Sequence, residues 1–190
     1  MKIAIIGGTG KMGYGLGLRL ALAGHSVYIG SRDEEKALAA QQRGREITGC
    51  SVIFGASNID AAKAADLVVI SVPAAGHYAT IESIADIIRA KDVLDITIPL
   101  AFKPLRYAPP LAGSNALETA QILGGGCRVA AGFHTVSALL LEDIAQELSA
   151  DTLIVGSNRE VKDLIIQLAT EIGLQAYDAG SLVMSPTVES

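Results

Sequence analysis

Residues 2–13 of the chain, Lys2-Ile-Ala-Ile-Ile-Gly-Gly-Thr-Gly-Lys-Met-Gly13, decide the expected fold. Residues 3–6 form an apolar run without polar alternation, which is typical of a strand buried on both faces. Gly8, Gly10 and Gly13 follow with the spacing G-x-G-x-x-G, and the apolar segment after them predicts a helix that ends at Gly24. In this context the early glycines let the backbone approach a pyrophosphate, and the last lets helix and strand pack closely. The N–H groups at the helix N-terminus then meet the phosphate charge. A glycine-rich turn without a ligand is the alternative.

The end of the second expected strand, residues 26–30, predicts which dinucleotide is bound. An NAD-binding protein usually carries Asp or Glu at this position, where it accepts hydrogen bonds from the ribose. Here Ser31 and Arg32 occupy it, and Lys36 follows one helical turn later. A hydroxyl and two cations suit the 2′-phosphate of NADP, so NADP is expected rather than NAD. The acidic residues 33–35 are explained as the first turn of a helix over 34–47, where the helix dipole favours them.

Length and composition indicate one soluble α/β domain over residues 1–190. Half of the residues are hydrophobic, with 20 Gly, no Trp and a mean hydropathy of +0.40. A buried parallel sheet explains this excess, because charges interrupt every apolar run before the ~18 residues of a membrane helix. The net charge of −5 gives no basic footprint for nucleic acid. Since the first strand begins at once and Cys50 and Cys127 are expected as free thiols, a cytoplasmic chain without signal peptide is expected.

Further apolar runs, ended by Gly or Pro, predict a doubly wound, mostly parallel sheet of the Rossmann type. The expected strands are 51–54, 67–72, 93–98, 128–132, 152–155 and 175–177. The expected helices are 58–65 capped by Ser57 or Asn58, 78–89, one capped by Asn115, 138–148 and 161–172. Strand 67–72 is expected to pair with the first strand on its far side, which places residues 71–73 at the topological switch point. Residues 178–190 show no clear pattern.

Two histidines and one long segment follow the carboxyl ends of these strands, where open α/β sheets bind ligands. His77 lies just beyond Pro73 and is either a surface residue or a functional one. His134, within Phe133-His-Thr-Val-Ser137, is expected to orient a substrate or a nicotinamide; a histidine bonded only to backbone is the alternative. Residues 100–113 exceed a normal connection and are expected to form a lid or binding loop, with a domain linker as the alternative.

The chain resembles the NADPH-dependent reductases of the 5-deazaflavin coenzyme F420, the F420:NADP oxidoreductase family, over nearly its whole length. The resemblance rests on Gly7-Gly-Thr-Gly-Lys-Met-Gly13, Gly30-Ser-Arg32 with Lys36, Ser71-Val-Pro73, Asp95-Ile-Thr-Ile-Pro-Leu100, Phe133-His-Thr-Val-Ser-Ala138 and Asp178-Ala-Gly-Ser-Leu182. For the phosphates, the resemblance implies that the pyrophosphate is held by Thr9, Gly10, Lys11 and Met12, and the 2′-phosphate by Ser31, Arg32 and Lys36. For the rings, it implies that the nicotinamide end is lined by Val72, His77, Ile98 and Ala138. It also implies that His134 lies beside the deazaflavin. Gly76 competes with His77 for its aligned position.

The resemblance also implies the activity, a hydride transfer between NADPH and coenzyme F420, with both as cofactors and a homodimer as the assembly. Family members continue past residues 178–180 with a C-terminal helix that helps to form the deazaflavin pocket and the dimer. The sequence ends at Ser190, within residues 186–190 that open this helix, so we expect the helix to be missing here.

The chemistry of such a transfer agrees with what the sequence contains. The two carriers hold the reactive atoms, so the protein mainly binds, orients and excludes water. Correspondingly, the sequence offers no metal-ligand cluster and no nucleophile beside a base. The alternatives are an NADP-dependent reductase of another acceptor, such as a flavin or a ferric complex, and a non-catalytic NADP-binding module.

Overall fold

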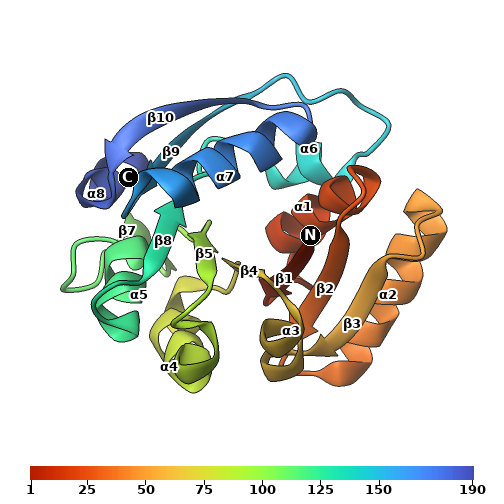
Figure 1. Cartoon of the computed structure of the whole chain (residues 1–190), viewed down its shortest axis with the longest axis horizontal. Helices are drawn as coiled ribbons and strands as arrows, with labels where there is room; N and C mark the ends of the chain where they lie inside the picture. The colour runs from red at the N-terminus through yellow and green to blue at the C-terminus, as the bar shows by residue number, and fades with distance from the viewer.

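The computed structural model describes residues 1–190 as an α/β domain built on one eight-stranded sheet (Figure 1). The strand order is β10-β9-β8-β5-β4-β1-β2-β3, and all neighbours are parallel except β8 and β9. The strands are β1 (Lys2–Ile6), β2 (Ser26–Ser31), β3 (Ile53–Ser57), β4 (Leu67–Ile70), β5 (Asp92–Asp95), β8 (Arg128–Ala131), β9 (Asp151–Gly156) and β10 (Gln175–Ser181). The helices are α1 (Lys11–Leu22), α2 (Glu34–Thr48), α3 (Asn58–Ala64), α4 (His77–Ile88), α5 (Asn115–Leu123), α6 (Ala138–Glu142), α7 (Arg159–Glu171) and α8 (Ser185–Val188), with 3₁₀ turns η1 (Ala74–Gly76) and η2 (Leu182–Met184).

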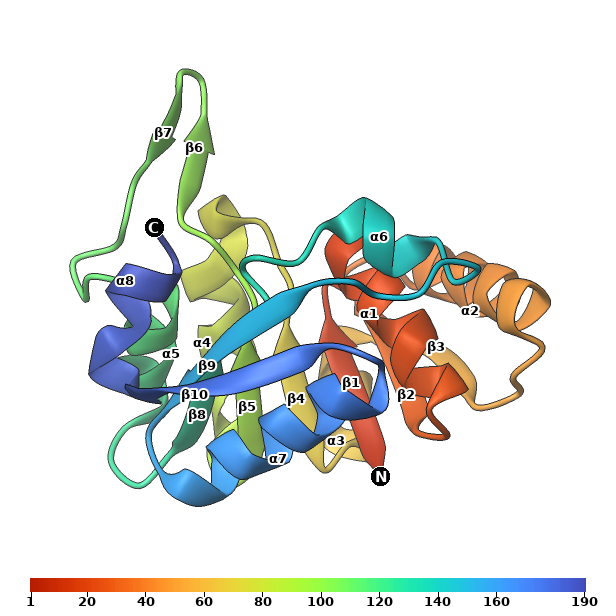
Figure 2. The same cartoon turned by 90° about the horizontal axis from the view of Figure 1, so that it is seen from above.

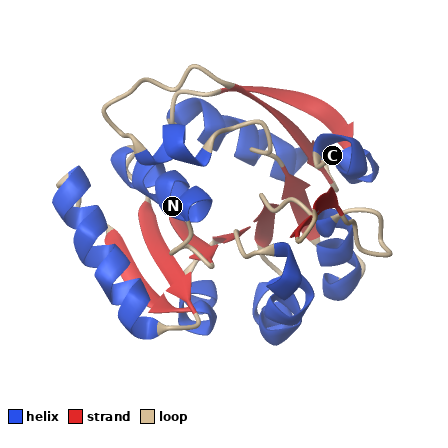
Figure 3. Cartoon of the chain, turned by 180° about the vertical axis from the view of Figure 1, so that it is seen from behind, coloured by secondary structure: helices blue, strands red, loops and turns tan.

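Helices cover both faces of the sheet, which explains the unbroken apolar run in β1 (Figure 3). Ile3 and Ile5 belong to the core cluster beneath α1, α2, α6 and α7, whereas Ala4 and Ile6 belong to the cluster beneath α3, α4 and α5. All four residues are fully buried. Successive side chains of a strand point to opposite faces, so a strand covered on both sides must be apolar at every position. The predicted doubly wound, mostly parallel fold is confirmed.

The switch point lies between β1 and β4. The chain adds β2 and β3 on one side of β1, and then returns to place β4, paired Ile3 to Leu67, on the other. The predicted pairing is therefore confirmed. Because the connections leave in opposite directions, a crevice opens at the carboxyl ends of these two strands.

Strand β5 ends at Asp95, three residues before the predicted end at Ile98. The carboxylate of Asp95 accepts a hydrogen bond from the Thr97 backbone N–H (3.0 Å) and another from the Thr97 hydroxyl (2.6 Å). These local bonds replace the sheet ladder and turn residues 96–98 toward the crevice. Likewise β4 ends at Ile70 rather than at Val72.

Helix α6 is also shorter than predicted, since it ends at Glu142 instead of Leu148. The buried Arg19 guanidinium of α1 donates hydrogen bonds to four backbone carbonyls of this region, those of Leu140, Leu141, Asp143 and Gln146 (2.6–3.1 Å). Carbonyls directed at one guanidinium do not align along a helix axis. Gly15 makes the close approach of α1 possible, because a Cβ atom there would lie 2.8 Å from the Glu142 nitrogen.

The long segment after β5 forms a hairpin that projects from the body of the domain (Figure 2). Strands β6 (Leu100–Phe102) and β7 (Leu105–Tyr107) pair antiparallel, with Leu100 opposite Tyr107 and Phe102 opposite Leu105. Directly opposed residues share a face, so these four large apolar side chains lie on one face of the hairpin.

The last residues, which show no pattern in the sequence, pack against the N-terminus of α5. Strand β10 runs on to Ser181, and the Ser185 hydroxyl lies 2.6 Å from that of Ser114. The buried Glu189 carboxylate accepts hydrogen bonds from the backbone N–H groups of Asn115 (2.7 Å) and Ala116 (3.1 Å). Ser114, not the predicted Asn115, caps α5 by accepting from the Leu117 N–H.

None of the helices combines the length and the apolar character needed to cross a bilayer.

Candidate dinucleotide and acceptor site

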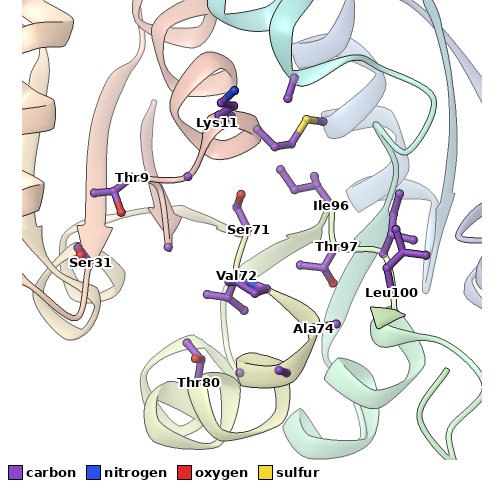
Figure 4. Close-up of a pocket in the computed structure, with 18 of the residues that line it drawn as sticks. Thr9, Lys11, Ser31, Ser71, Val72, Ala74, Thr80, Ile96, Thr97 and Leu100 are labelled. Carbon is purple, nitrogen blue, oxygen red and sulfur yellow. The ribbon is translucent and has the colours of Figure 1, made fainter. Parts of the chain in front are cut away.

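A single cavity of about 1250 Å³ runs along the carboxyl ends of β2, β1, β4, β5 and β8. Figure 4 shows Thr9 and Ser31 on one side of it and Thr97 and Leu100 across from them. Its two ends differ in chemistry.

The glycine turn after β1 brings an uncapped helix N-terminus to the cavity wall. Gly7 has φ = 73°, a conformation that side chains disfavour, and its N–H donates to the Asn58 side-chain oxygen (3.2 Å). No side chain caps α1 at Gly10, so its first N–H groups have no intrahelical partner. Of the residues predicted for the pyrophosphate, Thr9, Gly10, Lys11 and Met12 all line the cavity. These are the features of an anion site.

The other two glycines of the motif serve packing and lie behind the wall. A Cβ atom on Gly8 would lie 2.8 Å from the Ile5 carbonyl oxygen, and one on Gly13 would lie 2.6 Å from the Ser71 hydroxyl oxygen. Gly10 differs, since a Cβ atom there would meet nothing closer than 3.6 Å. The Gly8 N–H is engaged by the Gly30 carbonyl (2.9 Å) and is not directed at a ligand.

The cationic end of the cavity is formed by the turn between β2 and α2. Ser31, Arg32 and Lys36, the residues expected to hold the 2′-phosphate, all line it. Asp33 also lines it, but its carboxylate caps α2 by accepting from the Lys36 N–H (3.2 Å) and contacts the Lys36 amine (3.3 Å). The Lys36 N–H and amine hold the pKa of Asp33 below its usual range. Arg32 is exposed and pairs with no carboxylate in the structure.

At the opposite end the wall becomes apolar. Val72, Ile98 and Ala138, the residues expected at the nicotinamide, line it together with Ile96, Leu100 and Phe102. Here the structure brings Gly76, and not His77, to the cavity surface. The reason is that His77, in the first turn of α4, is 1% exposed and turns toward the interior.

The buried His77 ring joins two carboxylates for which the sequence predicts no role in the site. Its Nδ1 lies 2.7 Å from the Glu118 carboxylate and its Nε2 lies 2.8 Å from the Asp95 carboxylate. Thr119 also donates to Asp95 (2.7 Å), and Asn115 donates to the Thr97 hydroxyl (2.8 Å). Thr97 itself lines the cavity. Asp95 could have been recognised from the sequence, since it is an acidic residue at the end of an otherwise apolar strand. A buried charge of this kind needs hydrogen-bonding or charged partners.

His134 closes the apolar end. Its loop is held by the Phe133 N–H, which donates to the Thr152 hydroxyl (2.8 Å), and Phe133 has φ = 67°. Neither ring nitrogen of His134 has a partner in the protein. Burial lowers the pKa of His134 to about 4, so the ring is neutral at physiological pH and offers one donor and one acceptor. It also borders a smaller cavity of about 270 Å³ beside Tyr107 and Glu189.

No group of three or more His, Cys, Asp or Glu side chains is arranged to hold a metal ion. The donor set fits NADP: an uncapped helix N-terminus for the pyrophosphate, and a hydroxyl with cations for the 2′-phosphate. The remaining end, apolar with a neutral histidine, suits flat ring systems. Fold and site together define a Rossmann-like protein of the NADP-dependent oxidoreductase class.

Comparison with known proteins gives the particular family. Residues 2–99 match the family described as NADP oxidoreductase coenzyme F420-dependent. The chain is 41% identical over 197 residues to the F420-dependent NADP reductase of Methanothermobacter marburgensis, covering all of this chain and 88% of the relative. It is 39% identical over 199 residues to that of Methanocaldococcus jannaschii, again covering all of this chain and 88% of the relative. The chain belongs to this family, and the resemblance found in its motifs is confirmed.

A solved structure agrees with this assignment. The crystal structure of a protein provisionally named an F420-dependent NADP-reductase, from Arthrobacter sp. FB24, superposes with a TM-score of 0.84 at 26% identity. The match covers all of this chain and 89% of that one.

Proposed function

We propose that this chain catalyses hydride transfer between NADPH and the 5-deazaflavin coenzyme F420. The observation that carries the proposal is one continuous cavity that joins an NADP-type phosphate site to an apolar compartment with a neutral histidine. The activity named for the relatives in Methanothermobacter and Methanocaldococcus supports it.

In this proposal the phosphates are held at the glycine turn and at the β2–α2 turn. The N–H groups at the start of α1 and the Lys11 amine bind the pyrophosphate. Ser31, Arg32 and Lys36 bind the 2′-phosphate, and each charge-assisted hydrogen bond contributes about 1.5–3 kcal/mol. Gly10 leaves the open space that the pyrophosphate needs.

At the apolar end the chain's task is to orient two flat rings and keep water out. When bound, the two coenzymes supply the hydride donor and the hydride acceptor. Val72, Ile98 and Ala138 form the surface for the nicotinamide. His134 hydrogen-bonds the polar edge of the second ring and donates no proton to the reaction, since the hydride transfer itself needs no acid.

We further propose that the chain works in the cytoplasm, binds no nucleic acid and forms a homodimer. The free thiols of Cys50 and Cys127 and the net charge of −5 support the first two statements. The exposed apolar face of the β6–β7 hairpin supports the third, because Phe102 and Leu105 are 73% and 69% exposed.

A spectroscopic assay tests the activity. The protein is mixed with NADPH and oxidised F420, and both chromophores are followed; we expect the two absorbances to fall together with equal stoichiometry. Flavin and ferric citrate in place of F420 are the comparison acceptors. Transfer only to one of these overturns the choice of acceptor, and NADPH binding without transfer to any of the three indicates a non-catalytic module.

A further inference from the structure

The ionisable groups around the cavity are divided between its two ends. Cations line the phosphate end, where the only carboxylate, Asp33, is bound to Lys36. Behind the apolar end there are three carboxylates and one imidazole, namely Asp95, Glu118, Glu189 and His77. An oxidised nicotinamide dinucleotide has the complementary division, with anionic phosphates toward the cationic end and a positively charged ring toward the carboxylates.

The charge of the buried group can be assigned from its hydrogen bonds. Both nitrogens of the His77 ring lie within 2.8 Å of carboxylate oxygens, and an ionised carboxylate only accepts, so both nitrogens donate. Burial alone lowers the pKa of His77, but the hydrogen bonds and charges of Asp95 and Glu118 outweigh it and leave the pKa raised. His77 is therefore an imidazolium between two carboxylates, and the three groups carry a net charge of about −1 at neutral pH.

This charge lies immediately behind the wall of the apolar compartment. Asp95 is fully buried at the end of β5, and its carboxylate binds both the N–H and the hydroxyl of Thr97, which lines the cavity. Burial lowers the pKa of His134, the residue that closes the compartment, to about 4, and the Asp95 charge opposes this effect only in part. His134 itself is neutral and adds no cation there.

We propose that the buried Asp95–His77–Glu118 group stabilises the positive charge of the oxidised nicotinamide and so favours NADP⁺ over NADPH at this site. This inference rests on the proposed function, in that it requires NADP to occupy the cavity with its nicotinamide at the β5 end. The three residues touch no reacting atom; they act through the electrostatic potential that they impose on the ring.

The chemical step explains why such a charge matters. Hydride donation breaks the C4–H bond of the reduced nicotinamide, and the hydrogen leaves with both bonding electrons to form a new C–H bond on the deazaflavin. The neutral dihydropyridine becomes a pyridinium cation, and the reduced acceptor takes one proton from water. A fixed negative charge is therefore bound more favourably by the product form of the nicotinamide than by the reactant form.

Equilibrium binding measures the effect without the acceptor. The dissociation constants of NADP⁺ and NADPH are determined separately by calorimetry for the unmodified chain and for Asp95→Asn and His77→Gln. Asp95→Asn removes a negative charge, and we expect it to weaken NADP⁺ binding relative to NADPH binding by about three- to tenfold, roughly 0.65–1.4 kcal/mol of charge–charge energy. His77→Gln removes the cation, and we expect it to shift the ratio of the NADP⁺ and NADPH dissociation constants in the opposite direction.

The opposite signs separate electrostatics from structural damage, because general loosening weakens both forms alike in both variants. Asp86→Asn on the exposed side of α4 is the matched control, and we expect it to leave the ratio unchanged. Circular dichroism checks folding; where Asp95→Asn fails to fold, Glu118→Gln replaces it with the same expected sign. The inference is overturned if the folded variants keep the ratio of the two dissociation constants within twofold of its value in the unmodified chain. Failure of the unmodified chain to bind either form of NADP overturns the proposed function instead.

Discussion

The two ends of the cavity are built in different ways. The end assigned to the phosphates is lined mainly by two short segments of the chain, residues 7–12 and 31–36. The apolar end is assembled from β4, β5, β8, α6 and the β6–β7 hairpin, which are far apart in the sequence (Figure 2). One polar residue of its lining, Thr97, is held from behind by a buried hydrogen-bonded network.

This difference teaches where specificity for each ligand is located. A phosphate is recognised by local geometry, namely a helix N-terminus and two or three cations, so a short motif is sufficient. A pair of stacked rings is recognised by a surface and its electrostatic potential, which many elements must provide together. Substitutions at the first end are expected to change affinity, and those at the second to change geometry and rate.

The largest expected effects come from two glycines of the same motif. Gly13→Val is expected to destabilise the fold by about 3 kcal/mol or more, because its side chain meets the tightly packed Ser71. Gly10→Val is expected to keep the melting temperature and to weaken NADP binding at least a hundredfold, about 2.7 kcal/mol, since the branched side chain occupies the space of the pyrophosphate. Thermal unfolding and calorimetric titration of both variants test this contrast. Unchanged NADP affinity in Gly10→Val would place the phosphate site elsewhere.

The next effect concerns the choice between NADPH and NADH. We expect the unmodified chain to bind NADPH at least tenfold more tightly, a preference of about 1.4 kcal/mol or more. The double change Arg32→Ala with Lys36→Ala is expected to remove most of this preference, at a cost of about 2–4 kcal/mol in NADPH binding. NADH binding serves as the internal control and is expected to stay nearly constant. Equal affinities of the unmodified chain for the two coenzymes contradict the assignment of the 2′-phosphate site.

At the apolar end, His134→Ala is expected to raise KM for the deazaflavin and to lower kcat by only about ten- to a hundredfold, roughly 1.4–2.7 kcal/mol. NADPH affinity is expected to stay nearly the same, because the phosphate contacts lie at the other end. Steady-state kinetics with both substrates varied give the comparison. A ten-thousandfold loss of kcat at constant KM points instead to an acid–base role, and full activity indicates a structural histidine.

The smallest expected effect is a pH dependence of stability caused by Glu189. Burial raises its pKa to about 7 despite the bonds from the Ala116 and Asn115 N–H groups. Since the folded state holds this proton more tightly than the unfolded state, the stabilisation is complete below the ordinary pKa near 4.5 and is lost as the pH rises through 7. Denaturant unfolding of Glu189→Gln and the unmodified chain is expected to show the variant gaining about 1–2 kcal/mol relative to the unmodified chain between pH 6 and pH 8. A constant difference across this range contradicts the assignment.

The sequence by itself determined the fold class, the strand pairing at the switch point and the two segments, residues 7–12 and 31–36, that meet at one end of the cavity. Buried parallel strands are apolar at every position, and the phosphate motif is contiguous. Each of these features can therefore be recognised within a short stretch of sequence. The predictions failed at the ends of α6 and β5, where hydrogen bonds from side chains end the helix or strand. Arg19, more than a hundred residues away in the chain, ends α6 by binding its carbonyls, and Asp95 ends β5 by binding Thr97.

Only the tertiary structure decided the position of His77. In the sequence it is a polar residue after a proline at a carboxyl-end loop, which is equally compatible with the cavity wall and with the surface. In the folded chain it is buried between Asp95 and Glu118, carboxylates 18 and 41 residues away. A buried imidazolium is stable only where charged partners from other elements meet it, and that meeting is a property of the packed sheet and helices, which no local pattern contains.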